Sequence, residues 1–520
     1  MSELSARRKG QSRAARPQAN PFAEAYELVN QGKPRLAVRV ARRVAQQMKP
    51  SWQMHVTLGG ILIDAGAHAD EVRWIKEGVE LIRGCLVSVP PAHQAAAHYN
   101  LGTGFLSLGQ RQRGASPGTR PALAEAVSHL NASLQYQPNP EVRTNLASVL
   151  AAQGRWVEAC DEYTEIITAY PTRHEAVAGR GRTLVKIHDW IQPHKHLLYQ
   201  ALLDFRSAEE LAAGVPLYAE NYRQMIHYLE ERLEGASAPE EDASHARPRT
   251  PFEGWVWSER LGLNMCPGCE RSSPDAFDTA TIGGVLAGKG RSPSAIDVLE
   301  SMNVLHRTYA TARWCLAQGV GVAEVAVPDQ VAVMRARRGV RHDLRTGLTI
   351  AGLRGFYCVF DQVAYALNGY FHLGHPGRHV TFRTVWNPVG KKNKKKQMPE
   401  HRSAVHPHLQ RLALPPVAAL FRLAQSLETG CGMYKILRDM RNKLEHHVVV
   451  VTGSDKDSQY YHTISPDGVT AAALRTGRLA RAAILCLGSC LWRAEYLRVR
   501  CAQRKGHLVT HGPPTQVIRL

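Results

Sequence analysis

The first half of the chain repeats one helical pattern, and this repetition limits the possible folds more than any other feature. The clearest unit reads AHYNLGTGFLSLGQ and, after an insertion, AEAVSHLNASLQYQPN; its small and apolar positions are Leu101, Gly102, Phe105, Ala126, Leu130 and Pro138. The next unit, RTNLASVLAAQGRWVEACDEYTEIITAYP, repeats these positions at Leu146, Ala147, Leu150, Ala159, Tyr163 and Pro171. Weaker copies are HVTLGGILIDAG and AYELVNQGKPRLAVRVARRVAQQMKP, and a fifth unit begins near Ala176. Because each helix pair leaves an apolar face that only a neighbour can cover, the units are expected to stack into a solenoid with a concave groove.

This pattern resembles the tetratricopeptide repeat, which has small residues where its two helices touch and a proline at the exit. The insertion RQRGASPGTRP breaks the repeat length of about 34 residues and is expected to form a loop. Generic helical hairpins remain the alternative, because the period is imperfect. In either case residues 20–233 form a binding surface without chemistry of its own. We expect a protein or a trigger ligand to bind in the groove, so that the array acts as a scaffold or a sensor.

The composition restricts the class of protein. Lys and Arg total 65 against 45 Asp and Glu, a formal charge of +20, which fits a polyanionic partner. The 10 cysteines are scattered, as in a reduced cytoplasmic protein. No run of about 18 apolar residues appears, so no membrane span is expected. Residues 1–19 lack an apolar signal segment and are expected to be a disordered basic tail.

The second half is expected to be a separate helical domain. Residues 234–251 are rich in Pro, Ala, Ser and charge, and are expected to be a linker; the domain would then occupy residues 252–510. The sequence pattern predicts helices in five segments: 295–317, about 330–370, 415–427, the segment around 434–446, and 470 to about 502. HHVVVVTGSD follows the fourth segment as a short β-like run. No strand, glycine-rich loop and helix follow one another anywhere, so the chain is predicted to be all-α.

The segment YKILRDMRNKLEHHVVVV has two contrasting faces. On a helical wheel its apolar stripe comprises Ile436, Leu437, Met440 and Leu444. The opposite side gathers five polar groups, on Arg438, Arg441, Asn442, Glu445 and His446. Most such faces are only solvated. The i,i+4 spacing of Asn442 and His446 nevertheless puts an amide and an imidazole on one line, within reach of the Arg441 side chain.

RNKLEH resembles the R-polar-x-x-x-H signature of the HEPN superfamily, with Arg441, Asn442 and His446 at the matching positions. CVFDQVAYALNGYFHLG, HVTFRTVWN and EGWVWSERLGLN are similar to segments of a HEPN branch that is typically fused to tetratricopeptide repeats. The likeness covers about residues 255–504. It implies a C-terminal helical bundle, metal-independent cleavage of RNA without a cofactor, a role as a toxin or an anti-phage defence effector, and work as a homodimer. NMCPGCERSSPDAF departs from the family, which has no such cysteine pair.

The three signature residues suit this chemistry, because the 2′-hydroxyl of RNA can act as the nucleophile. His446 titrates near neutral pH and can exchange a proton. Arg441 offers a bidentate fork to phosphate oxygens. Asn442 can orient the imidazole or donate to the phosphate. Two protomers facing across a two-fold axis would supply a pair of each group, which makes this face an interface as well as an active site.

Two further clusters and one rival function remain open. Cys266 and Cys269 are half of a zinc site, with no second pair to complete it, so a metal centre is not expected. The loop GKKNKKKQ is either a solvated run or a holder of RNA phosphates; its lysines are Lys391, Lys392, Lys394, Lys395 and Lys396. The rival function is a non-catalytic scaffold, in which the repeats bind a partner and the bundle only dimerises. The intact signature favours the ribonuclease.

The lysine loop generates a first prediction. Replacing Lys391, Lys392, Lys394, Lys395 and Lys396 by Gln should weaken RNA binding and flatten its dependence on salt, because fewer counterions are released when fewer phosphates are contacted. The slope of log binding constant against log salt concentration measures this directly. An unchanged slope would assign the loop to solubility.

Overall fold

The computed structural model describes most of the chain. The described residues are 20–112, 120–214, 216–234, 248, 250–265, 278, 295–322, 340–341, 344–387, 407–412, 414–429, 433–446, 449–452 and 462–504. Its contacts divide the chain into two compact units, residues 1–111 and 112–520. The expected basic tail, the core of the expected linker (235–247) and the insertion loop (113–119) lie outside the described residues. The boundaries proposed at residues 233 and 252 remain predictions.

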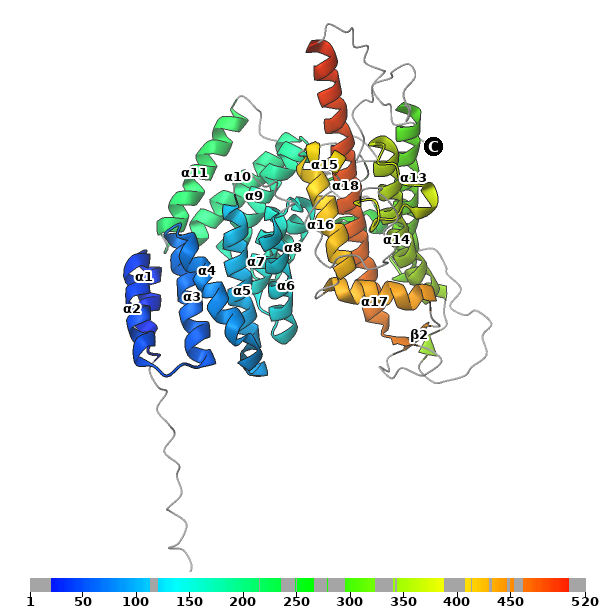
Figure 1. The fold of residues 1–520 in the computed structure, drawn as a ribbon. Helices are drawn as coiled ribbons and strands as arrows, with labels where there is room; N and C mark the ends of the chain where they lie inside the picture. The colour runs from blue at the N-terminus through cyan, green and yellow to red at the C-terminus, as the bar shows by residue number, and fades with distance from the viewer. Residues whose placement is uncertain are drawn as a thin grey trace, which may run out of the picture. The chain divides into compact units, whose positions relative to one another are not determined.

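The first unit consists of two helix pairs, as the repeats predict, and a fifth helix packed on the second pair. Its helices are α1 (Ala23–Asn30), α2 (Pro34–Gln47), α3 (Trp52–His68), α4 (Val72–Cys85) and α5 (Pro91–Arg111), with a short 3-10 turn at Leu86–Ser88 (Figure 1). Glycine lets α3 and α4 touch: a Cβ built on Gly78 would lie 2.5 Å from the carbonyl oxygen of Gly59. The small residues of the repeat therefore do stand where two helices meet.

Six further repeat helices open the second unit. They are α6 (Pro121–Tyr136), α7 (Pro140–Ala152), α8 (Trp156–Ala169), α9 (His174–Trp190), α10 (Lys195–Leu211) and α11 (Pro216–Leu233). Consecutive helices pack against one another from α6 to α11. The helical apolar positions predicted from the two clearest repeats are buried, including Leu130, Leu146 and Tyr163. The prediction of an N-terminal helical solenoid is confirmed.

The C-terminal part is a helical bundle with long, closely packed helices. Its helices are α12 (Pro251–Ser258), α13 (Ala295–Gly319), α14 (Leu344–Tyr370), α15 (Pro407–Arg411), α16 (Pro415–Thr429), α17 (Met433–His446) and α18 (Pro466–Arg504), with a 3-10 turn at Gly377–His379. α14 packs against both α13 and α18, and α17 crosses near one end of them (Figure 1). This confirms the all-α class. Within the described helices, none combines the length and the apolar character that crossing a membrane requires.

A small three-stranded sheet follows the motif helix, with the order β1-β2-β3. β2 (Val449–Thr452) is the short strand that the sequence predicts after His446. Its partners were not predicted: β1 (Val340–Arg341) pairs with it antiparallel and β3 (His462–Ile464) pairs with it parallel. The helix expected from about residue 330 is therefore wrong at its start, because residues 340–341 pair as a strand and α14 begins at Leu344.

Helix α8 joins the repeat helices to the bundle through buried charge. In a repeat array an outer helix shows one face to water, but α8 is buried at every position from Trp156 to Tyr163. Four of its residues carry carboxylates at spacings that put them along the helix: Glu158, Asp161, Glu162 and Glu165. Three arginines one turn apart on α18 meet them: Arg475, Arg478 and Arg481.

We call this contact between α8 and α18 the seam. Its ion pairs share partners. The Glu162 carboxylate pairs with Arg475 of α18 and, at 2.8 Å, with Arg143 of α7. Asp161 lies 3.2 Å from Nη1 of Arg481, whose Nε donates to the carbonyl oxygen of Gly262 at 2.7 Å. Arg478 pairs with Glu165. Burial of so many charges is tolerable only because each carboxylate has guanidinium partners in place.

Apolar contacts continue the seam along α18. Val157 of α8 packs with Ala482 and Leu485. Beyond them, the hydroxyl of Ser489 donates to the carbonyl oxygen of Trp190, where α9 ends. The described repeat helices α8 and α9 therefore rest on α18 over several turns.

The seam generates a prediction about acid stability. Burial alone would raise the pKa of the Glu162 carboxyl, but the charges of Arg475 and Arg143 outweigh it and lower the pKa to about 2. A lowered pKa stabilises the fold above the unfolded value, and this stabilisation disappears as the pH falls from about 4.5 to about 2; it amounts to about 3 kcal/mol. The melting temperature of Glu162→Gln should therefore be lower at neutral pH and fall less steeply over this acid range.

Glu230→Gln is the matched control, because Glu230 pairs with Arg206 at 2.8 Å but is 44% exposed. An exposed pair is screened by water, so the melting temperature of this variant should depend on acid pH as that of the wild type does. If the melting temperatures of wild type and Glu162→Gln fall equally steeply over this acid range, the lowered pKa of Glu162 does not stabilise the fold.

Candidate active site on helix α17

The apolar side of α17 is nearly as the sequence predicts. Leu437, Met440 and Leu444 are buried, with Tyr434 one turn earlier on the same side. Ile436 was predicted in this stripe and is 61% exposed, so that part of the prediction is wrong. The buried stripe runs 434, 437, 440, 444, and a residue directly before Leu437 is turned by about 100° away from it. The N-terminal turn of the helix therefore buries a tyrosine and exposes an isoleucine.

Arg441 lies against an aromatic ring of another helix. Its guanidinium carbon is 5.6 Å from the centre of the Tyr357 ring, which belongs to α14, and its Nε is 3.3 Å from Oε1 of Glu445. The side chain is 43% exposed. A guanidinium that lies over a ring face can still donate hydrogen bonds from its edge, so Arg441 has a neighbour in Tyr357 and is still reachable by an anionic ligand.

Tyr357 is itself fixed to the backbone of α17. Its hydroxyl donates to the carbonyl oxygen of Leu437 at 2.6 Å, one turn before Arg441. Burial raises the pKa of Tyr357 to about 12, so the hydroxyl keeps its proton at neutral pH and remains a donor. Near the other end of the helix, Arg354 of α14 donates to the carbonyl oxygen of Leu444. Two side chains of α14 thus hold the stretch of α17 that carries Arg441.

The remaining polar residues of the motif have different surroundings. Asn442 is exposed. α17 ends at His446, four residues later and on the same helical line; the imidazole lies outside the described side chains. Arg438, which the wheel groups with them, donates to the carbonyl oxygen of Glu428 at 2.8 Å and so ties α17 to the end of α16. The structure therefore places Arg441 and Asn442 on an accessible face, and it gives Arg438 a structural contact.

The first turn of α17 is bound to the repeat helix α8 by three buried side chains. Arg155, which directly precedes α8, binds the Glu158 carboxylate with two hydrogen bonds of 2.8 and 2.7 Å. Its Nη2 also donates to the Tyr434 hydroxyl at 2.6 Å, and that hydroxyl donates to Oε1 of Glu158. We call Arg155, Glu158 and Tyr434 the seam triad. Sequence reasoning missed it, as it missed Tyr357 and Arg354.

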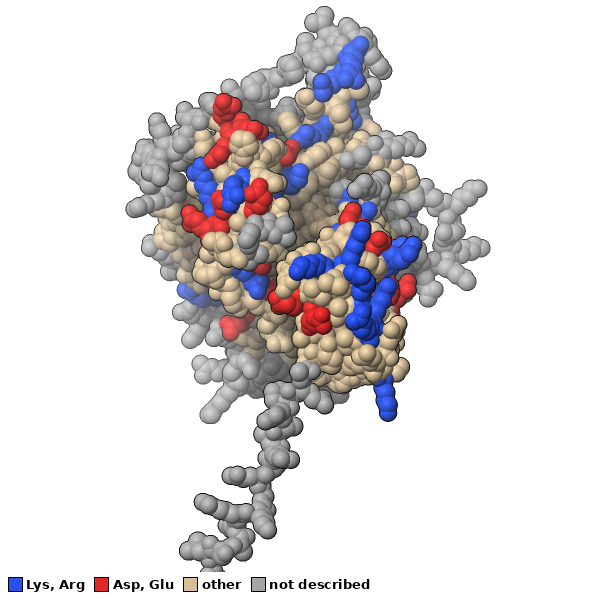
Figure 2. Space-filling view, turned by 90° about the vertical axis from the view of Figure 1, so that its left-hand side faces the viewer, with Lys and Arg blue, Asp and Glu red and all other residues tan. Residues whose placement is uncertain are grey.

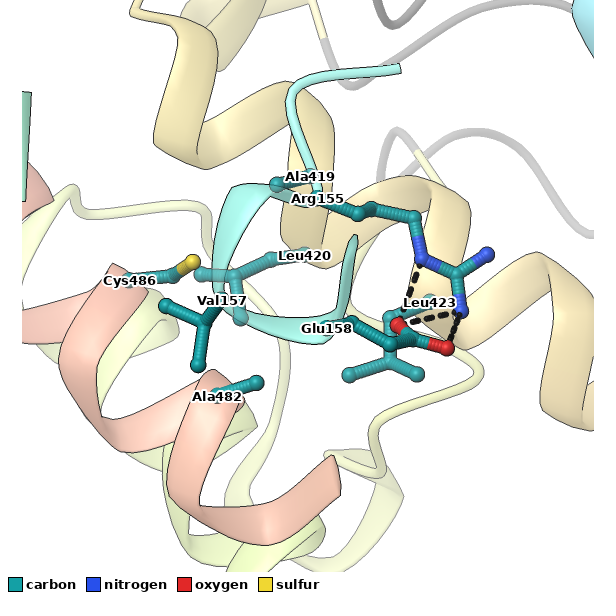
Figure 3. A pocket seen from close by; sticks show the side chains of 8 residues that line it. All are labelled: Arg155, Val157, Glu158, Ala419, Leu420, Leu423, Ala482 and Cys486. Atoms are coloured by element: carbon teal, nitrogen blue, oxygen red, sulfur yellow. Dashed lines mark hydrogen bonds and ion pairs between the residues drawn. The ribbon is translucent and has the colours of Figure 1, made fainter. Parts of the chain in front are cut away.

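A cavity lies beside the seam triad (Figure 3). Arg155 and Glu158 form one end of it, and the rest of its lining is apolar. These apolar side chains come from α8, α16 and α18: Val157, Ala419, Leu420, Leu423, Ala482 and Cys486. The cavity has room for about one water molecule, so the helices of the seam leave only a small gap next to the ion pair.

Two predicted clusters cannot be placed. Cys266, Cys269 and the lysines from Lys391 to Lys396 lie outside the described residues. Among the residues that the structure does describe, no three His, Cys, Asp or Glu side chains are grouped so as to hold a metal ion.

Part of the cationic excess lies on α2 in the first unit. Arg35, Arg39, Arg42 and Arg43 are all exposed, and Arg42 pairs with Glu77 at 2.7 Å. On the side of the molecule shown in Figure 2, Lys and Arg gather in clusters between acidic side chains. The apolar side of α2, with Ala37 and Val38, is packed in the core, so this helix exposes charge to solvent and keeps its apolar face inside.

A known family matches the C-terminal part of the chain. Residues 291–493 match the LA2681-like HEPN family. This segment runs from just before α13 into α18 and contains all of α14, α16 and α17. The expected HEPN-like bundle is thereby supported, together with the architecture of repeat helices ahead of a HEPN domain.

A solved structure is similar to the repeats. It is a thermophilic tetratricopeptide-repeat protein of Thermus thermophilus, with 15% identity and a TM-score of 0.33, over 40% of this chain and 98% of that one. No curated protein matches the sequence. The description of the repeat helices therefore rests on their own packing.

Proposed function

We propose that this protein is a metal-independent endoribonuclease whose active site is formed by Arg441, Asn442 and His446 of α17. The observation that carries the proposal is the setting of Arg441, which lies over the Tyr357 ring and is 43% exposed on a motif helix within a HEPN-like segment. An arginine of this kind is prepared to bind a phosphate without further ordering. As a HEPN-type effector, the protein would act in the cytoplasm as a toxin or in anti-phage defence.

The reaction follows from the chemistry of the three groups. The 2′-oxygen attacks the adjacent phosphorus while its proton passes to an imidazole of His446. The bond from phosphorus to the 5′-oxygen breaks, and that oxygen receives a proton, which leaves a 2′,3′-cyclic phosphate and a 5′-hydroxyl. Arg441 stabilises the negative charge that grows on the non-bridging oxygens. Asn442 orients the imidazole or donates to the phosphate, and the scheme requires no metal.

Two protomers complete this scheme. The reaction needs one group that accepts a proton and another that donates one, with positive charge between them. One α17 carries a single imidazole in its motif. We therefore propose a homodimer in which the Arg441 and His446 faces of two bundles meet across a two-fold axis. The repeat array, in turn, would bind the protein or trigger ligand that controls the enzyme.

The proposed reaction is tested with purified protein and RNA in EDTA. Cleavage should persist and leave 2′,3′-cyclic phosphate ends, and Arg441→Ala or His446→Ala should each reduce the rate by at least about a hundredfold. Lys435→Ala is the control, because Lys435 is exposed on the same helix and outside the motif. Activity that chelator abolishes, or that His446→Ala leaves intact, would refute the mechanism. A wild type that binds its partner but cuts no RNA would favour the non-catalytic scaffold.

The proposed dimer is tested by mixing two inactive variants. If the site is shared, Arg441→Ala and His446→Ala protomers that exchange should form heterodimers with one intact Arg441 and one intact His446. These heterodimers should regain part of the cleavage activity, measured after mixing and compared with each variant alone. A wild type that is monomeric at micromolar concentration and still cleaves RNA would exclude the shared site.

A further inference from the structure

The seam triad is an unusual way to attach one helix to another. Arg155, Glu158 and Tyr434 are 3%, 5% and 1% exposed, so a charged pair and a hydroxyl are buried together. All their principal groups are satisfied: the guanidinium also donates to Oγ of Ser426 at 2.8 Å and lies 5.2 Å from the centre of the Tyr434 ring. Apolar side chains of similar volume often stabilise such a contact as well as a buried ion pair does. The hydrogen bonds add a fixed geometry, because they are satisfied in only one arrangement of the two helices.

That geometry bears directly on the motif. Tyr434 lies in the first turn of α17, and Arg441 follows about 10 Å further along the helix axis. α14 holds the middle and the end of the same helix through Tyr357 and Arg354. α17 is thus held at two places by two different parts of the chain. A displacement of the first turn of α17 at the Tyr434 contact would therefore turn the helix about its contacts with α14.

The space beside the triad is small. The cavity that Arg155 and Glu158 border has room for about one water molecule, so the contact tolerates only a small displacement of these side chains (Figure 3).

We propose that Arg155, Glu158 and Tyr434 are positioning residues, through which the repeat helix α8 sets the orientation of the motif helix and thereby the rate of RNA cleavage. This inference rests on the proposed ribonuclease function and adds the route by which the array controls it. A small change at this contact would alter the alignment of Arg441 with the phosphate. Such a change acts on the chemical step more than on RNA binding, because misalignment of a catalytic group mainly slows the reaction of bound substrate.

The test compares two contacts of α8: its contact with Tyr434 of α17 and its contact with Arg481 of α18. Tyr434→Phe removes the hydroxyl and keeps the ring, and Glu158→Gln removes the charge; both alter the link to α17. Asp161→Asn is the matched control, since Asp161 is equally buried on α8 but its partners are Arg481 of α18 and Arg260. Each full-length variant is measured for kcat and KM on single-stranded RNA and for its melting temperature.

We expect kcat to fall in the variants at the Tyr434 contact and to stay nearly unchanged in Asp161→Asn. Tyr434→Phe and Glu158→Gln should lower kcat about tenfold or more, with KM changed by less than about threefold, because a misplaced group can slow a reaction by up to about a hundredfold. Asp161→Asn should lower the melting temperature and leave kcat within about twofold of wild type. Losses of kcat that simply follow the melting temperature in all three variants would overturn the proposal.

A second readout does not depend on cleavage. Amide hydrogen exchange of α17 should become faster in Tyr434→Phe and stay at the wild-type rate in Asp161→Asn. If the wild type cuts no RNA but exchange of α17 is faster in Tyr434→Phe alone, the proposed ribonuclease function is refuted and the positioning role of Tyr434 is supported. If exchange of α17 is the same in both variants, the positioning role is refuted, whether or not the protein cleaves RNA.

Discussion

The second unit of this structure depends on three buried carboxylates of α8, those of Glu158, Asp161 and Glu162, each of which pairs with an arginine. A buried carboxylate without a cation is very unfavourable, so Glu162 and Asp161 are compatible with the fold only where Arg475 and Arg481 can reach them. The spacing of three residues between successive arginines on α18 matches the helical turn, and this fixes which turn of α18 lies against α8. The ion pairs of the seam therefore determine the register of α8 against α18 as well as adding stability. Ser489 and Arg493 extend it by donating to the carbonyl oxygens of Trp190 and Asp189.

The same seam links the repeats to the candidate active site. α17 contributes Tyr434 to α8 and receives hydrogen bonds from Tyr357 and Arg354 of α14. Its polar residues then divide into two groups. Arg438 donates a hydrogen bond to α16, whereas Arg441 lies over the Tyr357 ring and is 43% exposed. The contact of Arg441 with Tyr357, together with its exposure, is the structural observation on which the proposed chemistry rests.

The sequence predicts the parts of this structure that local spacing determines. The repeats place Leu146, Tyr163 and their counterparts inside, because a buried face recurs at helical spacing within one pair. The same reasoning puts Arg441 and Asn442 on the outer face of α17. It fails at Ile436, because the buried tyrosine of the first turn shifts the apolar stripe and leaves the isoleucine exposed.

The contacts that support the site could not be predicted in this way, because they join distant parts of the chain. Tyr357 and the carbonyl of Leu437 are 80 residues apart, and Tyr434 lies 276 residues from Glu158. The carboxylates of α8 and the arginines of α18 each resemble the charged face of a solvated helix when viewed alone. Only their pairing reveals that both faces are buried. The strands β1 and β3 were missed for the same reason, since two or three residues carry little pattern without their partner β2.

Charge across α8 and α18 is expected to make the repeat helices and the bundle of the second unit one cooperative structure. A double-mutant cycle on Glu162→Gln and Arg475→Met, measured by urea unfolding at neutral pH, tests this cooperativity. We expect a coupling free energy of at least about 1 kcal/mol, because two residues in one buried network do not act independently. Both substitutions should shift the same unfolding transition. Additive effects, or effects on two separate transitions, would show that the repeat helices and the bundle unfold independently.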